Sequence, residues 1–226
     1  IGDKIVCYSI APWTNSVVYY DEATKTTVKK RLTPGSEEWT TIWTAFLNDL
    51  ADHLYEKGWF NDAYIGIDER GFNKAAFDLI DSIKRGIPTP LKLKSAGAMD
   101  GFVEKKDLAM RVDVGSIAVK AHPQQFEEIR QAREDAGLRT TIYTCTGHKP
   151  GNFSLSAPGE SYWTMMYSYS VGGEGYLRWA YDSWVENPLE DTTHNAFEAG
   201  DCFLVFPDDS EAKVTKSSTR FEKMAE

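Results

Sequence analysis

The stretch "AYIGIDERG" at residues 63–71 carries the strongest indication of both architecture and chemistry in this chain. Its first five residues form a short apolar run, which is typical of a strand buried on both faces of a sheet. The run stops at Asp68 and Glu69, two adjacent carboxylates. In barrel enzymes the catalytic groups lie where the parallel strands end. The stretch therefore predicts a parallel strand with a candidate catalytic pair at its carboxyl end.

Strand-like and helix-like runs alternate along the rest of the chain. Residues 36–59 predict a helix, because Ser36 is a suitable N-cap and apolar residues recur at a spacing of three to four. Further helices are predicted over 73–86, 123–137 and 159–173, and further strands over 4–10, 91–98, 116–122, 139–145, 175–184 and 202–207. Residues 16–32 contain two β-prone runs around a polar turn and predict a hairpin inserted in a loop.

This alternation predicts an α/β fold, a parallel sheet with helices outside it. No strand is followed by Gly-x-Gly-x-x-Gly and no phosphate-binding loop motif occurs, so nucleotide folds have no support. A (β/α)8 TIM-type barrel fits better. Because about six core strands are counted, we expect the barrel to be incomplete, with its first two strands and its final helix missing. Residues 1–226 would then be one partial catalytic barrel domain with a hairpin insertion near 16–32.

Composition narrows the class of partner. The chain has 226 residues, with 25 Lys and Arg against 34 Asp and Glu, and the formal net charge is −9. Such a surface repels nucleic acids, and no apolar run is long enough to insert in a membrane. The three cysteines are widely spaced and no histidine pair has metal-ligand spacing. We expect no metal and no cofactor, and the sequence indicates no oligomeric state.

The carboxylates at 68 and 69 have two interpretations of equal weight. They are either helix-capping or ion-pairing groups, with Arg70 as a neighbour, or they are catalytic. Adjacent strand residues point to opposite faces, so both reach one pocket only if the strand has begun to turn. Gly66 and Gly71 bracket the pair and would make that bending cheap.

Two adjacent carboxylates suit one kind of glycoside hydrolysis in particular. Some glycosidases use the 2-acetamido group of the substrate in place of a protein nucleophile. One carboxylate then orients the acetamide and stabilises its positive charge, while the other protonates the leaving oxygen. Neighbouring residues on one turn are able to do both.

Seven other residues are candidate substrate contacts because they lie near predicted strand ends: Trp13, His122, Tyr143, Asn152, Arg178, Asp182 and Trp184. Asp182 would hold a sugar hydroxyl and Trp184 would stack under a sugar ring. The alternatives, left open here, are an ion pair between Asp182 and Arg178 and a tryptophan that only fills the core. Glu160 precedes a predicted helix and is interpreted as a helix-start acid.

Three stretches resemble the catalytic domain of glycoside hydrolase family 123: "AYIGIDER" (63–70), "GNFSLSAPGESYW" (151–163) and "GYLRWAYDSWVENPLEDTTHNAFEAGDCFLVFP" (175–207). That family contains retaining β-N-acetylgalactosaminidases with a β-sandwich before a (β/α)8 barrel. The resemblance implies that Asp68 orients the acetamide and that Glu69 is the general acid and then the base. It also implies a glycan or glycolipid substrate and a secreted, periplasmic or cell-surface location.

Two other functions remain possible on the same scaffold. One is a non-catalytic carbohydrate-binding protein, since a fold does not guarantee activity. The other is a glycosidase without acetamido participation, which would need a second essential carboxylate on another strand.

Overall fold

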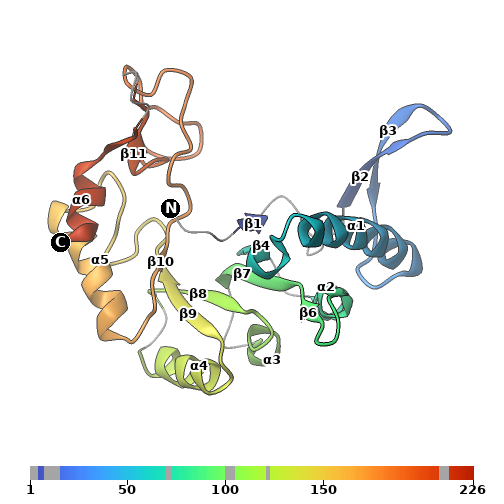
Figure 1. Cartoon of the computed structure of the whole chain (residues 1–226). Coiled ribbons are helices and arrows are strands. Elements are labelled where there is room, and N and C mark those ends of the chain that lie inside the picture. The colour runs from blue at the N-terminus through green and yellow to red at the C-terminus, as the bar shows by residue number, and fades with distance from the viewer. Residues whose placement is uncertain (1–4, 8–15, 70–72, 100–104, 121–122, 209–213) are drawn as a thin grey trace. The chain divides into compact units, whose positions relative to one another are not determined.

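The computed structural model describes residues 5–7, 16–69, 73–99, 105–120, 123–208 and 214–226 (Figure 1). The chain divides into two compact units, Ile1–Gly115 and Ser116–Glu226. The structure does not test the prediction of a single catalytic domain, which stays a prediction. None of the helices in the described ranges has an apolar stretch long enough to reach across a bilayer.

The first unit contains three parallel strands with helices packed around them. Its elements are β1 (Ile5–Cys7), β2 (Ser16–Asp21), β3 (Thr26–Arg31), α1 (Glu37–Glu56), η1 (Phe60–Asp62), β4 (Ala63–Asp68), α2 (Lys74–Ser82), β5 (Lys84–Arg85), β6 (Leu91–Lys92), β7 (Lys94–Met99) and α3 (Lys106–Ala109). The parallel strands run in the order β1-β4-β7.

Strand β4 lies between β1 and β7, and most of its residues are buried. Ala63, Ile65 and Ile67 are almost fully buried, as the apolar run at 63–67 predicts. Helix α1 covers the sheet through an apolar stripe that includes Trp39 and Leu47, both buried. Its first turn is capped by the Ser36 side chain, which accepts a hydrogen bond from the backbone N–H of Trp39. Helix α1 therefore begins where the sequence predicts it.

Strand β7 passes β4 at a distance that only glycine permits. Gly97 lies opposite Ile67 in the parallel register and has φ +141°. A Cβ atom built on Gly97 would lie 2.0 Å from the backbone oxygen of Ile67. The close approach therefore depends on the missing side chain at this position.

The second unit has its own run of parallel strands, in the order β8-β9-β10. Its elements are β8 (Val114–Ala118), which begins at the boundary, α4 (Pro123–Asp135), β9 (Arg139–Tyr143), α5 (Pro158–Ser170), β10 (Tyr176–Leu177), β11 (Val205–Phe206), β12 (Lys216–Ser217) and α6 (Thr219–Ala225). Helix α4 is tied to β9 by Arg133, which is fully buried and donates to Thr140 Oγ1 at 3.0 Å and to the carbonyl oxygen of Arg139 at 2.6 Å.

The expectation of a TIM-type barrel was wrong. The described strands of this sheet number six, in the order β1-β4-β7-β8-β9-β10, and no described pairing joins β1 to β10. The described part of the chain is an open α/β fold with small antiparallel sheets, because no described strand pairs to close a run on itself. The expected absence of a final helix was also wrong, since α6 occupies Thr219–Ala225.

Two predicted strands differ from the structure in extent or partner. The stretch 175–184 pairs in the parallel sheet only at β10, and its later residues are irregular. Strand β11 pairs antiparallel with β12 instead of joining the parallel run. Both stretches are dense in aromatic residues, which favour strands but also suit irregular packed segments.

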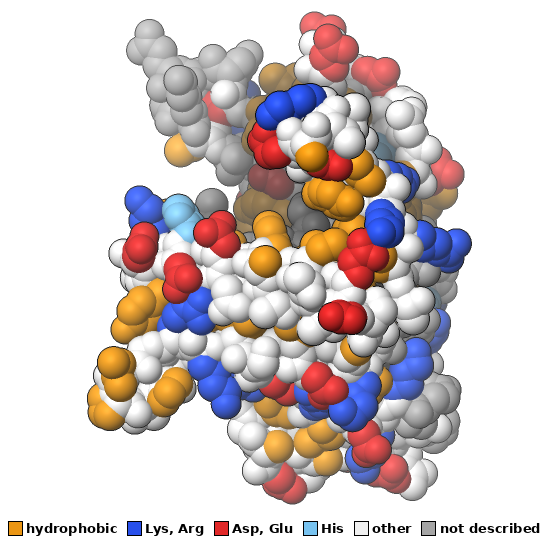
Figure 2. Space-filling view, turned by 90° about the vertical axis from the view of Figure 1, so that its right-hand side faces the viewer, with side chains coloured by type: hydrophobic (Ala, Val, Ile, Leu, Met, Phe, Trp, Pro, Cys, Tyr) orange, Lys and Arg blue, Asp and Glu red, His pale blue; other side chains and the backbone are white. Residues whose placement is uncertain are grey.

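Strands β2 and β3 form an antiparallel hairpin by themselves. Figure 1 shows that the hairpin stands out from the first unit near the start of α1. On the face of the molecule seen in Figure 2, acidic and basic side chains are interspersed with hydrophobic ones.

Candidate active site

Asp68 and Glu69 lie at the end of β4, and both are exposed although the strand before them is buried. Asp68 is the last residue of the strand and is paired in register with Ala98 of β7. The backbone N–H of Glu69 still donates to the carbonyl oxygen of Ala98, at 3.3 Å. The backbone of the pair is therefore held by β7, and both carboxylates lie at the carboxyl end of two parallel strands.

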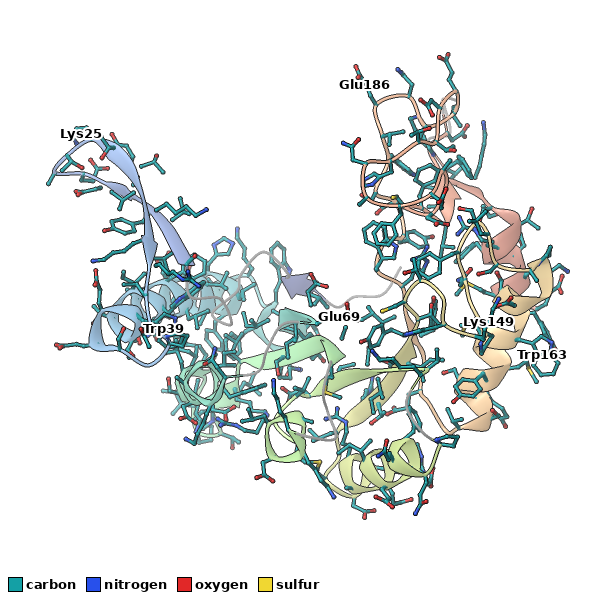
Figure 3. All side chains as sticks on the ribbon, turned by 180° about the vertical axis from the view of Figure 1, so that it is seen from behind. Lys25, Trp39, Glu69, Lys149, Trp163 and Glu186 are labelled. Atoms are coloured by element: carbon teal, nitrogen blue, oxygen red, sulfur yellow. The ribbon has the colours of Figure 1, made fainter. Side chains whose placement is uncertain are left out.

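Glu69 has a left-handed backbone, with φ 46°. This conformation costs a residue with a side chain on the order of 1 kcal/mol and is concentrated at functional sites. It also ends the extended geometry directly after Asp68, so the alternation of side chains along a strand does not apply to this pair. The turn that a shared pocket requires is thus present. Figure 3 labels Glu69 at this position.

In the second unit, Arg178 is held against aromatic rings just after β10. Its guanidinium lies over the ring of Phe153, with 4.6 Å from Cζ to the ring centroid, and 6.0 Å from the ring of Trp179. Trp179 in turn packs against Phe197, with 4.4 Å between ring centroids. Arg178 Nη2 donates to the carbonyl oxygen of Asp201 at 2.6 Å. Arg178 Nε and Nη1 are buried and have no hydrogen-bond partner among the described residues.

Burial governs the titration of this region. Desolvation lowers the pKa of Arg178, and desolvation likewise lowers the pKa of Arg220. It raises the pKa of Tyr176, whose hydroxyl lies 2.7 Å from Thr144 Oγ1.

Tyr143 and Asn152 are interior residues. Tyr143 ends β9, is 5% exposed and is paired in register with Leu177 of β10, which places it at the same strand ends as Arg178. Asn152 is fully buried and accepts a hydrogen bond from Ser161 Oγ at 3.0 Å, at the start of α5. The structure thus gives Asn152 a role in anchoring α5.

Asp182 and Trp184 lie in the irregular segment after β10. Asp182 is exposed and forms an isolated antiparallel bridge with Phe203. Trp184 is 39% exposed, and its indole N–H donates to the carbonyl oxygen of Val205 at 2.8 Å. Trp13 and His122 fall outside the described residues.

Sequence reasoning did not single out Trp179, Phe153, Phe197 or Asp201. Asp201 is 2% exposed, accepts hydrogen bonds from the backbone and side chain of Ser154, and lies 3.6 Å from Arg220 Nη1. The density of aromatic residues in 175–184 was the available signal for this cluster. No group of three or more His, Cys, Asp or Glu residues within the described ranges is arranged to hold a metal ion.

Comparison with known proteins shows the family to which this chain belongs. The family model "Glycoside hydrolase 123, catalytic domain" matches residues 1–226. The chain belongs to glycoside hydrolase family 123. A similar solved structure is that of a family 123 glycoside hydrolase from Clostridium perfringens, reported in a study of glycolipid glycan hydrolysis. The two are 40% identical with a TM-score of 0.84, over 98% of this chain and 39% of that one.

This family 123 chain therefore spans about two fifths of the length of that relative. A search of curated proteins found no match. The resemblance to glycoside hydrolase family 123 is confirmed, whereas the roles of Asp68 and Glu69 stay a prediction.

The Glu160 carboxylate makes a contribution to stability that is separate from the predicted role of Asp68 and Glu69. Its carboxylate accepts hydrogen bonds from Lys149 Nζ at 2.6 Å, from the backbone N–H of Gly151 at 2.7 Å and from that of Ala157 at 3.3 Å. These bonds, that from Lys149 first, lower the pKa of Glu160 below its ordinary value of 4.5. A carboxyl with a lowered folded-state pKa stabilises the fold above the unfolded value, and this contribution is lost as the pH falls through the folded value.

We expect Glu160→Gln to lower the free energy of unfolding at pH 7 by about 1 kcal/mol. The difference from wild type should shrink as the pH falls from about 4.5 through the lower folded-state pKa, where the folded wild-type carboxyl becomes protonated. Urea unfolding across this pH range measures it, with Glu128→Gln on the exposed face of α4 as control. A difference that is independent of pH would contradict the assignment of the effect to the charge.

Proposed function

We propose that this family 123 chain is the catalytic part of a retaining glycosidase that releases β-linked N-acetylgalactosamine by a substrate-assisted mechanism. The observation that supports the proposal is the adjacent pair Asp68–Glu69 at the end of a buried parallel strand, with the backbone turned at Glu69. Family membership supports hydrolysis of glycosides, and the pair supports this particular mechanism.

In the proposed reaction Glu69 gives its proton to the leaving oxygen as the bond from that oxygen to C1 breaks. The carbonyl oxygen of the 2-acetamido group bonds to C1 and forms a cyclic oxazolinium. Asp68 orients the acetamide and stabilises its positive charge. Glu69, now a carboxylate, takes a proton from water as the water oxygen bonds to C1. The bond between C1 and the acetamide oxygen breaks, which restores the 2-acetamido group, and the configuration is retained.

The predicted sugar contacts that the structure describes lie in the second unit, and we retain four of them as proposed contacts with a glycan. Arg178 carries two donors without described partners, and Trp184 exposes part of its indole face. Tyr143 and Asp182 complete this set as proposed contacts. A guanidinium and an indole suit a sugar, because hydroxyl oxygens accept from N–H groups and C–H faces stack on aromatic planes.

The substrate we propose is the glycan of a glycolipid or a related glycan, as studied for the Clostridium perfringens relative. Because such glycans are found outside cells, we also propose that the enzyme acts at a secreted, periplasmic or cell-surface location.

The mechanism is tested by comparing aryl glycosides that differ only at C2. We expect the full-length protein to hydrolyse an aryl N-acetyl-β-galactosaminide. It should hydrolyse the plain aryl β-galactoside at least about 10²-fold more slowly, because only the former carries the acetamide. The first-formed anomer, followed by NMR, should be β.

Equal rates on the two sugars would contradict acetamido participation and favour a second essential carboxylate. Failure on both sugars and on the gluco epimer would favour a non-catalytic carbohydrate-binding protein. An α anomer as first product would exclude retention.

A further inference from the structure

The β2–β3 hairpin has two faces of different composition. Directly opposed residues of an antiparallel pair share one face, and the register pairs Ser16 with Arg31, Val18 with Lys29 and Tyr20 with Thr27. We call the face formed by these residues the outer face; it consists of Ser16, Val18, Tyr20, Thr27, Lys29 and Arg31.

The opposite face is turned toward the body of the first unit. Val17 on that face is 6% exposed, and Lys30 Nζ lies 2.5 Å from the carboxylate of Glu38 in the first turn of α1. The outer face is exposed: Val18 is 64% exposed and Tyr20 is 54% exposed. Figures 1 and 3 show that the hairpin projects from α1, with Lys25 at its tip.

The outer face is cationic although the chain as a whole is acidic. It carries Lys29 and Arg31, both exposed, and no carboxylate, whereas the net charge of the chain is −9. Lys29 has no ion-pair partner among the described residues. Charge complementarity therefore selects a partner with a negative group.

Tyr20 narrows the chemistry of that partner. The register places Tyr20 two residues along from the Val18–Lys29 pair on the same face, so that an exposed phenol ring and an ammonium are neighbours. An aromatic plane stacks on the C–H face of a sugar, and a neighbouring ammonium suits a carboxylate on that sugar.

The hairpin also lies in the connection that follows strand β1. It lies between β1 and α1, and β1 is parallel to β4. Strand β1 therefore ends at the edge where Asp68 and Glu69 lie. In open α/β sheets, ligands bind outside the carboxyl ends of the strands.

We propose that the outer face of the hairpin binds an acidic sugar of the same glycan from which the N-acetylgalactosamine is cleaved. The inference rests on the proposed function. It makes glycans that carry a carboxylated sugar the preferred substrate class, with Lys29 and Tyr20 as specificity-determining residues.

The test compares three substrates of the full-length protein: an aryl N-acetyl-β-galactosaminide, an oligosaccharide that carries a carboxylated sugar, and the same oligosaccharide with its carboxylate converted to an amide. Lys29→Gln should lower kcat/KM about three- to fivefold on the acidic oligosaccharide alone, and Lys29→Glu about tenfold. Lys29→Arg should retain the preference. The matched control is Lys30→Gln, which removes a cation from the other face.

Raising the salt concentration should reduce the preference of wild type for the acidic oligosaccharide, because exposed charges are screened. Tyr20→Ser should lower kcat/KM on both oligosaccharides and leave the aryl glycoside unchanged. Circular dichroism of each variant shows whether the fold is kept, and the aryl glycoside reports separately on the catalytic pair.

Equal effects of Lys29→Gln on the acidic and amide oligosaccharides would overturn the inference. So would Lys29-dependent binding to phosphatidylserine vesicles that lack sugar, or a concentration-dependent rise in mass that Lys29→Gln abolishes, since the partner would then be a lipid surface or a second copy. If wild type does not hydrolyse the aryl glycoside, the proposed function fails, and calorimetric binding of the two oligosaccharides still tests the hairpin.

Discussion

Glu69→Gln should lower kcat on an aryl N-acetyl-β-galactosaminide between about 10²- and 10⁴-fold. Glutamine has nearly the shape of glutamate but neither gives nor takes the proton that the leaving oxygen and the water require. Both side chains face the same backbone cost at φ 46°, so the substitution should leave the fold unchanged. Steady-state kinetics on the full-length protein measure the effect, with thermal unfolding as the check on folding.

The leaving group provides the internal control for this variant. A dinitrophenyl group departs with little protonation, so its substrate should lose much less rate in Glu69→Gln than an alkyl glycoside loses. Glu186→Gln, at an exposed carboxylate in the second unit, should leave both rates unchanged. If Glu69→Gln keeps its rate within about threefold on a poor leaving group, Glu69 is not the general acid.

Gly97→Ala should destabilise the protein by at least about 3 kcal/mol or prevent its folding. The added Cβ would lie 2.0 Å from the oxygen of Ile67 and 2.9 Å from two further backbone atoms of that residue. No rotamer change relieves a clash with backbone, so β7 has to move away from β4. Asp68, which is paired with Ala98, would then lose its register. Thermal unfolding should show a midpoint lowered by about 6 °C or more.

Gly137→Ala is the matched control. Gly137 also has a positive φ, +71°, but nothing lies within 4 Å of a Cβ built there. Gly137→Ala should therefore lower the free energy of unfolding only by the backbone strain, about 1 kcal/mol. The difference between the two variants reports the close approach of β4 and β7 together with the larger strain of φ +141°. Equal losses of stability in the two variants would show that the approach is not a constraint.

Local patterns determined much of this molecule. The apolar run before Asp68 predicted β4, and the cap at Ser36 with the stripe behind it predicted where α1 begins and placed its end within three residues. These signals are readable because burial on both faces of a strand, and burial on one face of a helix, leave a period in the sequence itself. The carboxylate pair was found in the same way, as a break in that pattern.

Local patterns of this kind did not predict which distant segments pair with one another. The expected closure into a barrel failed because closing a sheet depends on which strands meet, and hydrophobic periodicity carries no record of the partner. The stretch 175–184 was predicted as a full strand for the same reason. Its aromatic residues lie instead around Arg178 and Trp184, in contacts made with residues 20 or more positions away.

By itself, the sequence determined the elements, the family and the identity of the candidate acid. Only the tertiary structure decided that the backbone turns at Glu69, that Gly97 sets the approach of β7 to β4, and that the hairpin turns Lys29 outward and Lys30 inward. The physical reason is that each of these depends on atoms brought together from separate segments, whereas an element and its cap depend on neighbours a few residues away.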